Sequence, residues 1–191
     1  MAAPVPFVVG FVAGVTPGKW ARVWGERRRR HPLELRPLAQ AQAIAALAAG
    51  ELDAAFLRLP VADESLSTIP LYEEQPVVLA PKDHPIAAFE SLALADLAGE
   101  TQLEGDWDET IPLVAANVGV VIVPQAVARA HSRRDLVARP VTDAPATRVA
   151  LAWPIARTSP EVEEFIGIVR GRTANSSRGP QPPRPERSRR R

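Results

Sequence analysis

One segment of the sequence resembles a phosphate-binding loop, and few other groups have the spacing needed for chemistry. The segment Gly14-Val-Thr-Pro-Gly18-Lys19 combines two glycines with a lysine. The phosphate-binding motif requires four residues between its glycines and a Ser or Thr after the lysine. Here three residues separate the glycines, and Trp20 follows the lysine. The spacing therefore excludes a nucleotide-binding loop of this type.

The remaining reactive side chains form no catalytic constellation. The chain has no cysteine, so a thiolate nucleophile and a thiolate metal site are excluded. His31, His84 and His131 are scattered, without the Ser, acid or second-histidine spacing of a catalytic or metal site. The acidic cluster at residues 106–109 could attract a cation, but it is interpreted as a solvated loop. We expect no enzyme activity, no cofactor and no metal.

Length and composition indicate a small globular protein. With 191 residues, of which 46% are hydrophobic, the chain has room for one ordinary domain or two small lobes. No apolar run approaches the length of about 20 residues that spans a bilayer. Pro4 and Pro6 interrupt the N-terminal apolar stretch, and no basic region precedes it, so a secretion signal is not predicted. A cytoplasmic location is expected.

The charge is unevenly distributed along the chain. Residues 173–191 contain six Arg and one Glu, a net charge of +5, whereas residues 1–172 carry a net charge of −4. The tail has nothing apolar to bury, so it is predicted to be disordered. The tail and the run Arg27–Arg30 could contact nucleic-acid phosphates without sequence preference. The favoured alternative is a solubilising tail and an ordinary helix end.

The hydrophobic pattern predicts an α/β fold. Strands are predicted over residues 7–12, 33–38 and 53–56. Between them lie a helix that starts at Thr16-Pro17, with Thr16 as N-cap, and a helix over residues 41–49 that ends at Gly50. This order predicts a parallel sheet with right-handed crossovers. Further strands are predicted over residues 76–81, 120–123, 136–139 and 148–153, and helices over residues 92–97, 127–133 and 160–171.

Five phrases of the sequence, in this order, carry a family resemblance. They are FVVGF…HPLEL (7–35), LAAGELDAAF (47–56), LYEEQPVVLAPKDHP (71–85), LVAANVGVVIVP (113–124) and RVALAW (148–153). Together they resemble the effector-binding domain of bacterial LysR-type transcriptional regulators, which has the fold of type 2 periplasmic binding proteins. The resemblance covers roughly residues 5–171.

The resemblance implies two Rossmann-like lobes. Lobe I would comprise residues 5–81 and 148–172, and lobe II residues 82–147. Relative to the family a segment is missing near residues 98–112, so the second lobe is expected to be shortened. Only six residues precede Phe7, and the family's N-terminal helix-turn-helix is therefore expected to be absent.

The resemblance also implies a ligand site between the lobes. In such folds the ligand lies at the carboxyl ends of parallel strands, where helix N-termini present N–H groups to an anion. The positions that match the family's effector cleft are Gly14, Val15, Thr16, Gln40, Arg58, Asn117 and Gly119. For several of them an ordinary structural role is the alternative: a helix cap for Thr16, an exposed helix start for Gln40 and a left-handed turn for Asn117. A solvated side chain is the favoured interpretation of Arg58.

The expected function is that of a stand-alone effector-binding module. It would sense a small, carboxylate-like metabolite and be linked to transcription regulation without its own DNA-binding domain. No membrane contact and no sequence-specific nucleic-acid binding are expected. A homodimer is possible; the alternative functions are a mixed dimer with a full LysR-type regulator, or a degenerate remnant that binds nothing.

Overall fold

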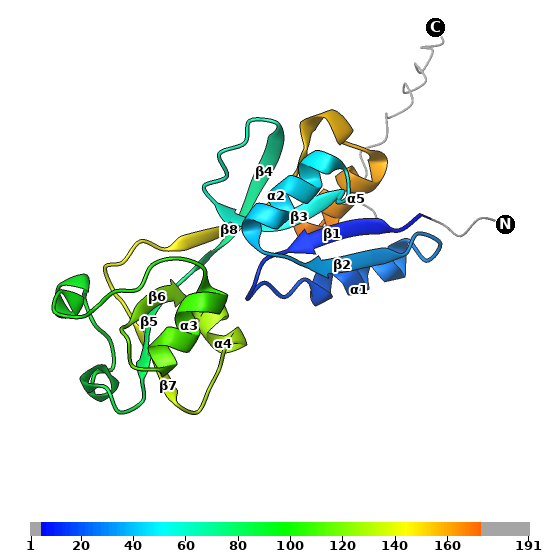
Figure 1. The fold of residues 1–191 in the computed structure, drawn as a ribbon. Coiled ribbons are helices and arrows are strands. Elements are labelled where there is room, and N and C mark those ends of the chain that lie inside the picture. Colours follow the sequence, from blue (N-terminus) through cyan, green and yellow to red (C-terminus); the bar gives the residue numbers. More distant parts are fainter. Residues whose placement is uncertain (1–4, 173–191) are drawn as a thin grey trace, which may run out of the picture.

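The computed structural model describes residues 5–172, which form two lobes of unequal size (Figure 1). The larger lobe contains β1 (Phe7–Phe11), α1 (Gly18–Arg27), β2 (Leu33–Pro37), α2 (Gln40–Ala49), β3 (Ala54–Leu59), β4 (Leu66–Glu74), β8 (Thr147–Pro154), the 3-10 helix η3 (Ile155–Arg157) and α5 (Pro160–Val169). The smaller lobe contains β5 (Pro76–Pro81), the 3-10 helices η1 (Pro85–Ala88) and η2 (Leu94–Leu97), α3 (Trp107–Ala115), β6 (Val121–Pro124), α4 (Gln125–Ala130) and β7 (Leu136–Pro140).

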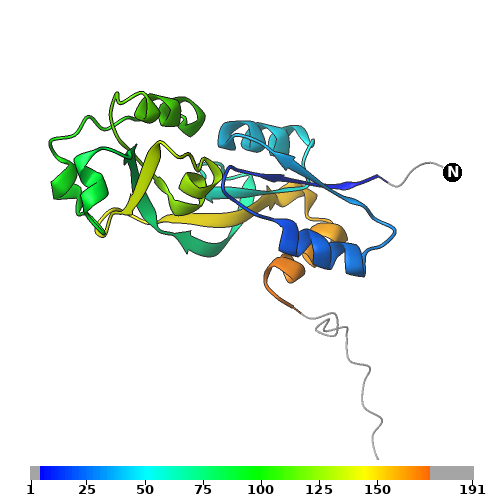
Figure 2. The same cartoon turned by 90° about the horizontal axis from the view of Figure 1, so that it is seen from below.

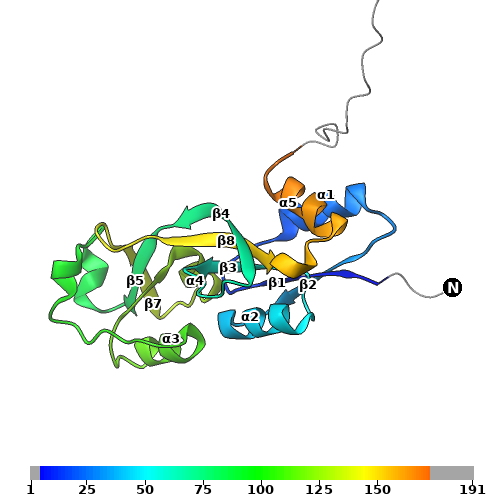
Figure 3. The same cartoon turned by 90° about the horizontal axis from the view of Figure 1, so that it is seen from above.

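The sheet of the larger lobe has the strand order β2-β1-β3-β8-β4. Strand β1 pairs in parallel with both β2 and β3, which confirms the predicted parallel arrangement. Strand β8 is antiparallel to its neighbours β3 and β4. Helices α1 and α5 cover one face of this sheet and α2 covers the other (Figures 2 and 3).

Aromatic stacking holds α1 on the sheet. The ring of Trp24 stacks on Phe7 with the ring centres 4.7 Å apart, and Trp20 stacks on Phe56 at 4.6 Å. Trp24 and Phe56 are completely buried. Offset stacking of this kind adds to the free energy gained by burying apolar surface.

Two helix ends test the predicted caps. Gly50 ends α2 in the left-handed conformation, with φ 81°, as the sequence predicts. The cap predicted at Thr16 is wrong: α1 begins at Gly18, and its N-cap residue is Pro17, which has no side-chain cap hydrogen bond. The helix is also shorter than the sequence suggests, because Arg28 already leaves the helical conformation.

The structure moves the boundary between the lobes. Strand β5 lies at the centre of the second sheet, in the order β6-β5-β7, with both neighbours antiparallel to it. Residues 76–81 therefore belong to lobe II, and the first crossing falls at Gln75 rather than after Pro81. The chain returns between β7 and β8. Residues 173–191, where disorder is predicted, lie outside the described residues.

Two of the longer elements of the structure are absent from the sequence-based prediction. One is β4, which pairs with β8 along most of its length. The other is α3, at the place where the missing segment is expected. Asp106 is the N-cap of α3 and accepts a hydrogen bond from the amide of Asp108 at 2.8 Å. The acidic cluster is therefore a helix start and not a solvated loop.

Within residues 5–172 no helix is long and apolar enough to cross a membrane.

Candidate functional site

Arg58 occupies the centre of the region between the lobes. It lies near the carboxyl end of β3, and its side chain is buried, with the residue only 6% exposed. The solvated arginine favoured by the sequence is therefore wrong. A buried guanidinium requires compensating partners, because an unpaired charge is costly in a poorly hydrated interior.

The partners of Arg58 come from two segments of lobe I. Its Nε donates to Glu74 Oε2 at 2.7 Å, and its Nη2 donates to Glu74 Oε1 at 3.1 Å and to the carbonyl oxygen of Ala13 at 2.8 Å. Glu74 is 5% exposed and also accepts from Thr147 Oγ1 at 3.2 Å. Among the described residues, Nη1 donates to none, so it is the part of the guanidinium left for a further acceptor.

Lobe II also contacts Arg58, through Trp107. The guanidinium carbon lies 5.0 Å from the centre of the Trp107 ring, at the first residue of α3. A guanidinium within about 6 Å of an indole ring is attracted by the ring's quadrupole. The same side chain thus contacts the loop after β1, the end of β4 and the second lobe.

Gln40 positions Arg58 through the backbone. Its Oε1 accepts from the amide of Arg58, and its Nε2 donates to the carbonyl of Arg58, both at 2.9 Å. The side chain therefore fastens the first turn of α2 to β3. This role differs from both interpretations of the sequence, because the amide group is neither simply exposed nor free to face an anion.

The loop Gly14–Thr16 lies beside the second lobe. A Cβ added to Gly14, which has φ +83°, would lie 2.9 Å from backbone atoms of Ala126 and Val127 at the start of α4. The amide of Val15 donates to the carbonyl of Val12 at 3.2 Å, and the side chain of Val15 belongs to the hydrophobic core of lobe I. Of the three predicted loop positions, Thr16 is the exposed one.

The structure does not bring Asn117 and Gly119 to Arg58. Both residues follow the C-terminal end of α3. Trp107, which contacts Arg58, is the first residue of this helix, and the two ends of a helix of this length are roughly 13 Å apart. Asn117 has φ 60°, which confirms the left-handed alternative. A Cβ on Gly119 would lie 2.3 Å from the carbonyl oxygen of Thr101, so this glycine permits close packing within lobe II.

Helix ends give the lobe I side of the site a positive character. The N-termini of α1 and α2 follow the carboxyl ends of β1 and β2, and neither helix has an acidic residue in its first turn. Exposed N–H groups and the helix dipole favour an anion at such ends.

Tyr72 lies close enough to Glu74 and Arg58 to be influenced by their charges. Burial raises the pKa of Tyr72, and the Glu74 carboxylate raises it further. This phenol is therefore a neutral hydrogen-bonding group at neutral pH.

Sequence reasoning missed Glu74, Trp107 and Ala126. A signal for Glu74 exists: a single Arg in the otherwise apolar strand Ala54–Leu59 must be paired if that strand is interior. No comparable signal marks Trp107 or Ala126, since their contacts depend on how the two lobes meet. Residues 5–172 contain no group of three His, Asp or Glu side chains able to hold a metal ion.

The family model described as the LysR substrate binding domain matches residues 7–109 and 105–174. The chain belongs to this family. The two matched segments overlap at residues 105–109, inside the stretch 98–112 where the sequence predicts a missing segment.

Relatives of known role are regulators of transcription. The Hca operon transcriptional activator HcaR of Escherichia coli K12 is 25% identical over 201 aligned positions, which cover 87% of this chain and 68% of the relative. That alignment is longer than the chain itself, so the relative has residues for which this chain has no counterpart. The regulator CatR of Pseudomonas putida is 31% identical over 134 residues, 54% of this chain and 46% of the relative. The chain thus spans about two thirds of one relative and about half of the other.

A solved structure confirms the fold. The BenM effector-binding domain with its effector benzoate superposes with a TM-score of 0.70 at 18% identity, over 87% of this chain and 90% of that domain. The LysR substrate-binding domain described here therefore has the type 2 periplasmic-binding-protein fold, with two α/β lobes.

Proposed function

We propose that this domain binds a small carboxylate between its lobes and acts as an effector sensor linked to transcription regulation. The observation that carries the proposal is the Nη1 group of Arg58, a donor without a partner among the described residues, on a guanidinium fixed by Glu74 and Ala13. A fixed guanidinium binds a carboxylate with less loss of side-chain entropy than a mobile one.

Effector entry requires the lobes to separate slightly. The loop at Gly14 contacts the start of α4, and Trp107 lies over Arg58. The effector would replace these contacts with its own, so its binding would change how the lobes meet. This coupling between ligand and lobe position is what a sensor needs.

The test is thermal unfolding of the full chain followed by tryptophan fluorescence, with a panel of small carboxylates that includes benzoate. A ligand present at about 100 times its Kd adds roughly 2.7 kcal/mol to the free energy of unfolding. We expect one carboxylate to raise the Tm, and an uncharged amide analogue of that compound to have no effect.

Two variants locate the site. Arg58→Lys keeps the charge but loses the guanidinium fork, and Thr16→Val removes the exposed hydroxyl three residues after Ala13, whose carbonyl accepts from Arg58. Both should reduce the Tm shift, whereas Thr68→Val, an exposed position on β4, should leave it unchanged. Equal shifts for all variants would place the ligand elsewhere, and a panel without any shift would contradict the proposed function.

Pairing with a full LysR-type regulator is the second candidate function. Helix α3 ends in a region that exposes two apolar side chains, Leu113 and Val118, which are 43% and 49% exposed. Covering them in a homodimer or a mixed dimer would remove apolar surface from water. Substituting both with Ser should abolish such a complex in light scattering of the purified chain, alone or mixed with a regulator.

A further inference from the structure

Strand β2 forms a free edge of the larger sheet (Figure 1). In the described part of the chain it pairs only with β1, in an unbroken parallel register from Leu33 to Pro37. The strand at the opposite edge, β4, is different, because its register shifts between Pro70 and Tyr72. A bulge and an internal proline protect an edge strand against pairing with another chain. Strand β2 has no such protection before its last residue.

The backbone of β2 keeps hydrogen-bonding groups on its free side. The carbonyl of Pro32 accepts a hydrogen bond from β1 at 2.8 Å, and the amide of Leu38 donates one to β1 at 3.1 Å. Because the direction of the backbone groups alternates along a strand, the even-numbered residues of β2 face β1. The amide and carbonyl groups of Leu33 and Leu35 therefore face away from the sheet.

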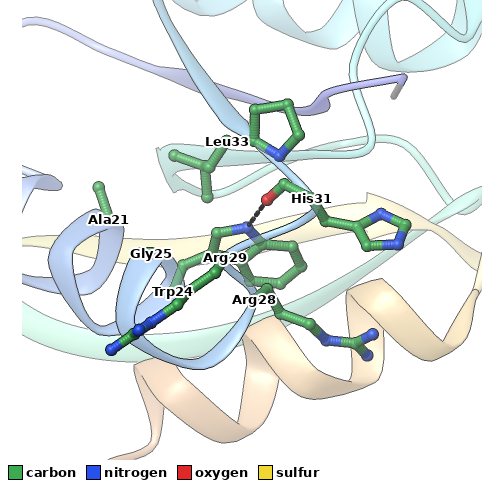
Figure 4. Close-up of a pocket in the computed structure, with 8 residues that line it drawn as sticks. Ala21, Trp24, Gly25, Arg28, Arg29, His31 and Leu33 are labelled. Atoms are coloured by element: carbon green, nitrogen blue, oxygen red, sulfur yellow. Dashed lines mark hydrogen bonds between the residues drawn. The ribbon is translucent and has the colours of Figure 1, made fainter. Parts of the chain in front are cut away.

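A hollow lies beside β2 on each face of the sheet. One lies between α1 and the start of β2, and its lining includes Trp24 and Leu33 (Figure 4). The other lies between α2 and the end of β2, and its lining includes Arg36 and Ala46. Helix α2 packs mainly over β1, β3 and β8. The helices therefore leave room on both faces for another strand to add beside β2.

The side chains of β2 are complementary to a second copy of the same strand. Glu34 and Arg36 lie on the α2 face and form an exposed ion pair, with Arg36 Nε 2.7 Å from Glu34 Oε1. In an antiparallel pair of β2 strands with its two-fold axis at Leu35, each Glu34 lies opposite Arg36 of the second copy. Leu35, already partly buried against the core, then meets its own copy on the α1 face.

We propose that two copies of this domain pair through β2, so that their five-stranded sheets form one continuous sheet. The two Leu35 residues exchange N–H···O bonds, and the amide of each Leu33 donates to the carbonyl of Pro37 in the second copy. Glu34 and Arg36 form ion pairs between the copies on the α2 face. The contact uses only the free edge of β2, so it does not depend on the binding of a carboxylate between the lobes.

The test is sedimentation velocity of the full chain over a wide range of concentration. The wild type should change from monomer to dimer as its concentration rises. Leu35→Pro removes an amide that only the second copy uses, so this variant should remain a monomer. Leu35→Ala is the matched control, because it also loses the leucine side chain but retains the amide, and it should still dimerise. Thermal unfolding should show that both variants are folded.

Charge reversal gives a second test, which does not depend on how the proline variant folds. Glu34→Arg places like charges opposite each other at both ends of the paired strands, so the Kd of the dimer should rise about tenfold. Arg36→Glu should have the same effect. Glu34→Arg/Arg36→Glu exchanges the two charges and makes each opposite pair attractive again. This double variant should therefore dimerise nearly as tightly as the wild type.

A variant of lobe II distinguishes this contact from pairing through the end of α3. Leu113→Ser/Val118→Ser should dimerise like the wild type if β2 is the interface. A chain that stays monomeric at every concentration would overturn the proposal. A dimer that survives Leu35→Pro and both single charge reversals, or one that only the lobe II variant abolishes, would do the same.

Discussion

At the scale of single residues, the ion pair between Arg58 and Glu74 fixes the guanidinium on which the proposed effector site depends. Replacing a buried pair with apolar groups is often neutral, but removing one partner leaves an uncompensated charge. The pair is therefore best understood as a way of holding the guanidinium in place between the lobes. Its contribution to stability should appear only when one partner is removed.

We predict that Arg58→Ala lowers the free energy of unfolding by about 3–5 kcal/mol, because the Glu74 carboxylate then stays buried without its partner. The double variant Arg58→Met/Glu74→Leu should be closer to the wild type than either single variant. Urea unfolding of the wild type, Arg58→Met, Glu74→Leu and the double variant gives the coupling energy. If the two single losses simply add up in the double variant, the residues do not act as a pair.

Gly14 gives the second prediction at this scale. Gly14→Ala forces a side chain into a left-handed conformation and against the backbone of Ala126 and Val127. A loss of about 1–3 kcal/mol is expected. Gly18→Ala is the control, because Gly18 is the first residue of α1 and a Cβ there meets nothing within 4 Å. The control should be neutral or slightly stabilising in the same unfolding experiment.

At the scale of elements, the sequence predicts correctly those helices and strands whose signals lie within their own segment. Apolar runs and turn residues were enough for β1, β2, α2, β5 and the Gly50 cap, because these signals lie within the segment itself. Helix α3 is not predicted because Pro112 interrupts its pattern, although Asp106 and the acidic residues of its first turn are ordinary signals of a helix start. The pairing of Arg58 with Glu74, 16 residues away, depends on β8 lying beside β3 and on β4 lying on the other side of β8. Nothing local encodes that arrangement.

The start of α3 offers an element-scale prediction. Asp106→Ala removes the side-chain acceptor for the amide of Asp108 and should cost about 1 kcal/mol. Asp106→Ser retains an acceptor and should cost much less. Because α3 carries Trp107, loss of the cap should also increase hydrogen exchange at the α3 amides. Unchanged exchange in Asp106→Ala would mean that packing alone holds the first turn.

At the scale of the whole molecule, several carboxyl groups link stability to pH. Hydrogen bonds from Ser65 lower the pKa of Asp63, and Arg133 lowers the pKa of Asp135. The pKa of Glu161 is lowered mainly by its own amide. A carboxyl whose pKa is lower in the folded state stabilises the fold above its unfolded pKa. That contribution disappears as the pH falls through the folded pKa.

We therefore predict that stability falls as the pH drops below about 4, near the unfolded pKa values of these groups. Asp135→Asn should make the decrease between pH 5 and pH 2 shallower, since it removes one of the linked protons. Urea midpoints measured at half-unit pH intervals test this. A decrease just as steep in Asp135→Asn would assign the linkage to other groups.

The pairing of Glu74 with Thr147 has a consequence for the history of the chain. These residues are register partners on adjacent antiparallel strands, at the points where the chain leaves lobe I and returns to it. Lobe II is thus an insertion between two hydrogen-bonded neighbours, and a two-residue Asn-Gly turn could close them into a hairpin. When the two ends of an insertion are neighbours in a sheet, the insertion can become longer or shorter without disturbing that sheet. Changes in the length of lobe II would therefore leave the pairing of β4 with β8 in the larger sheet unchanged.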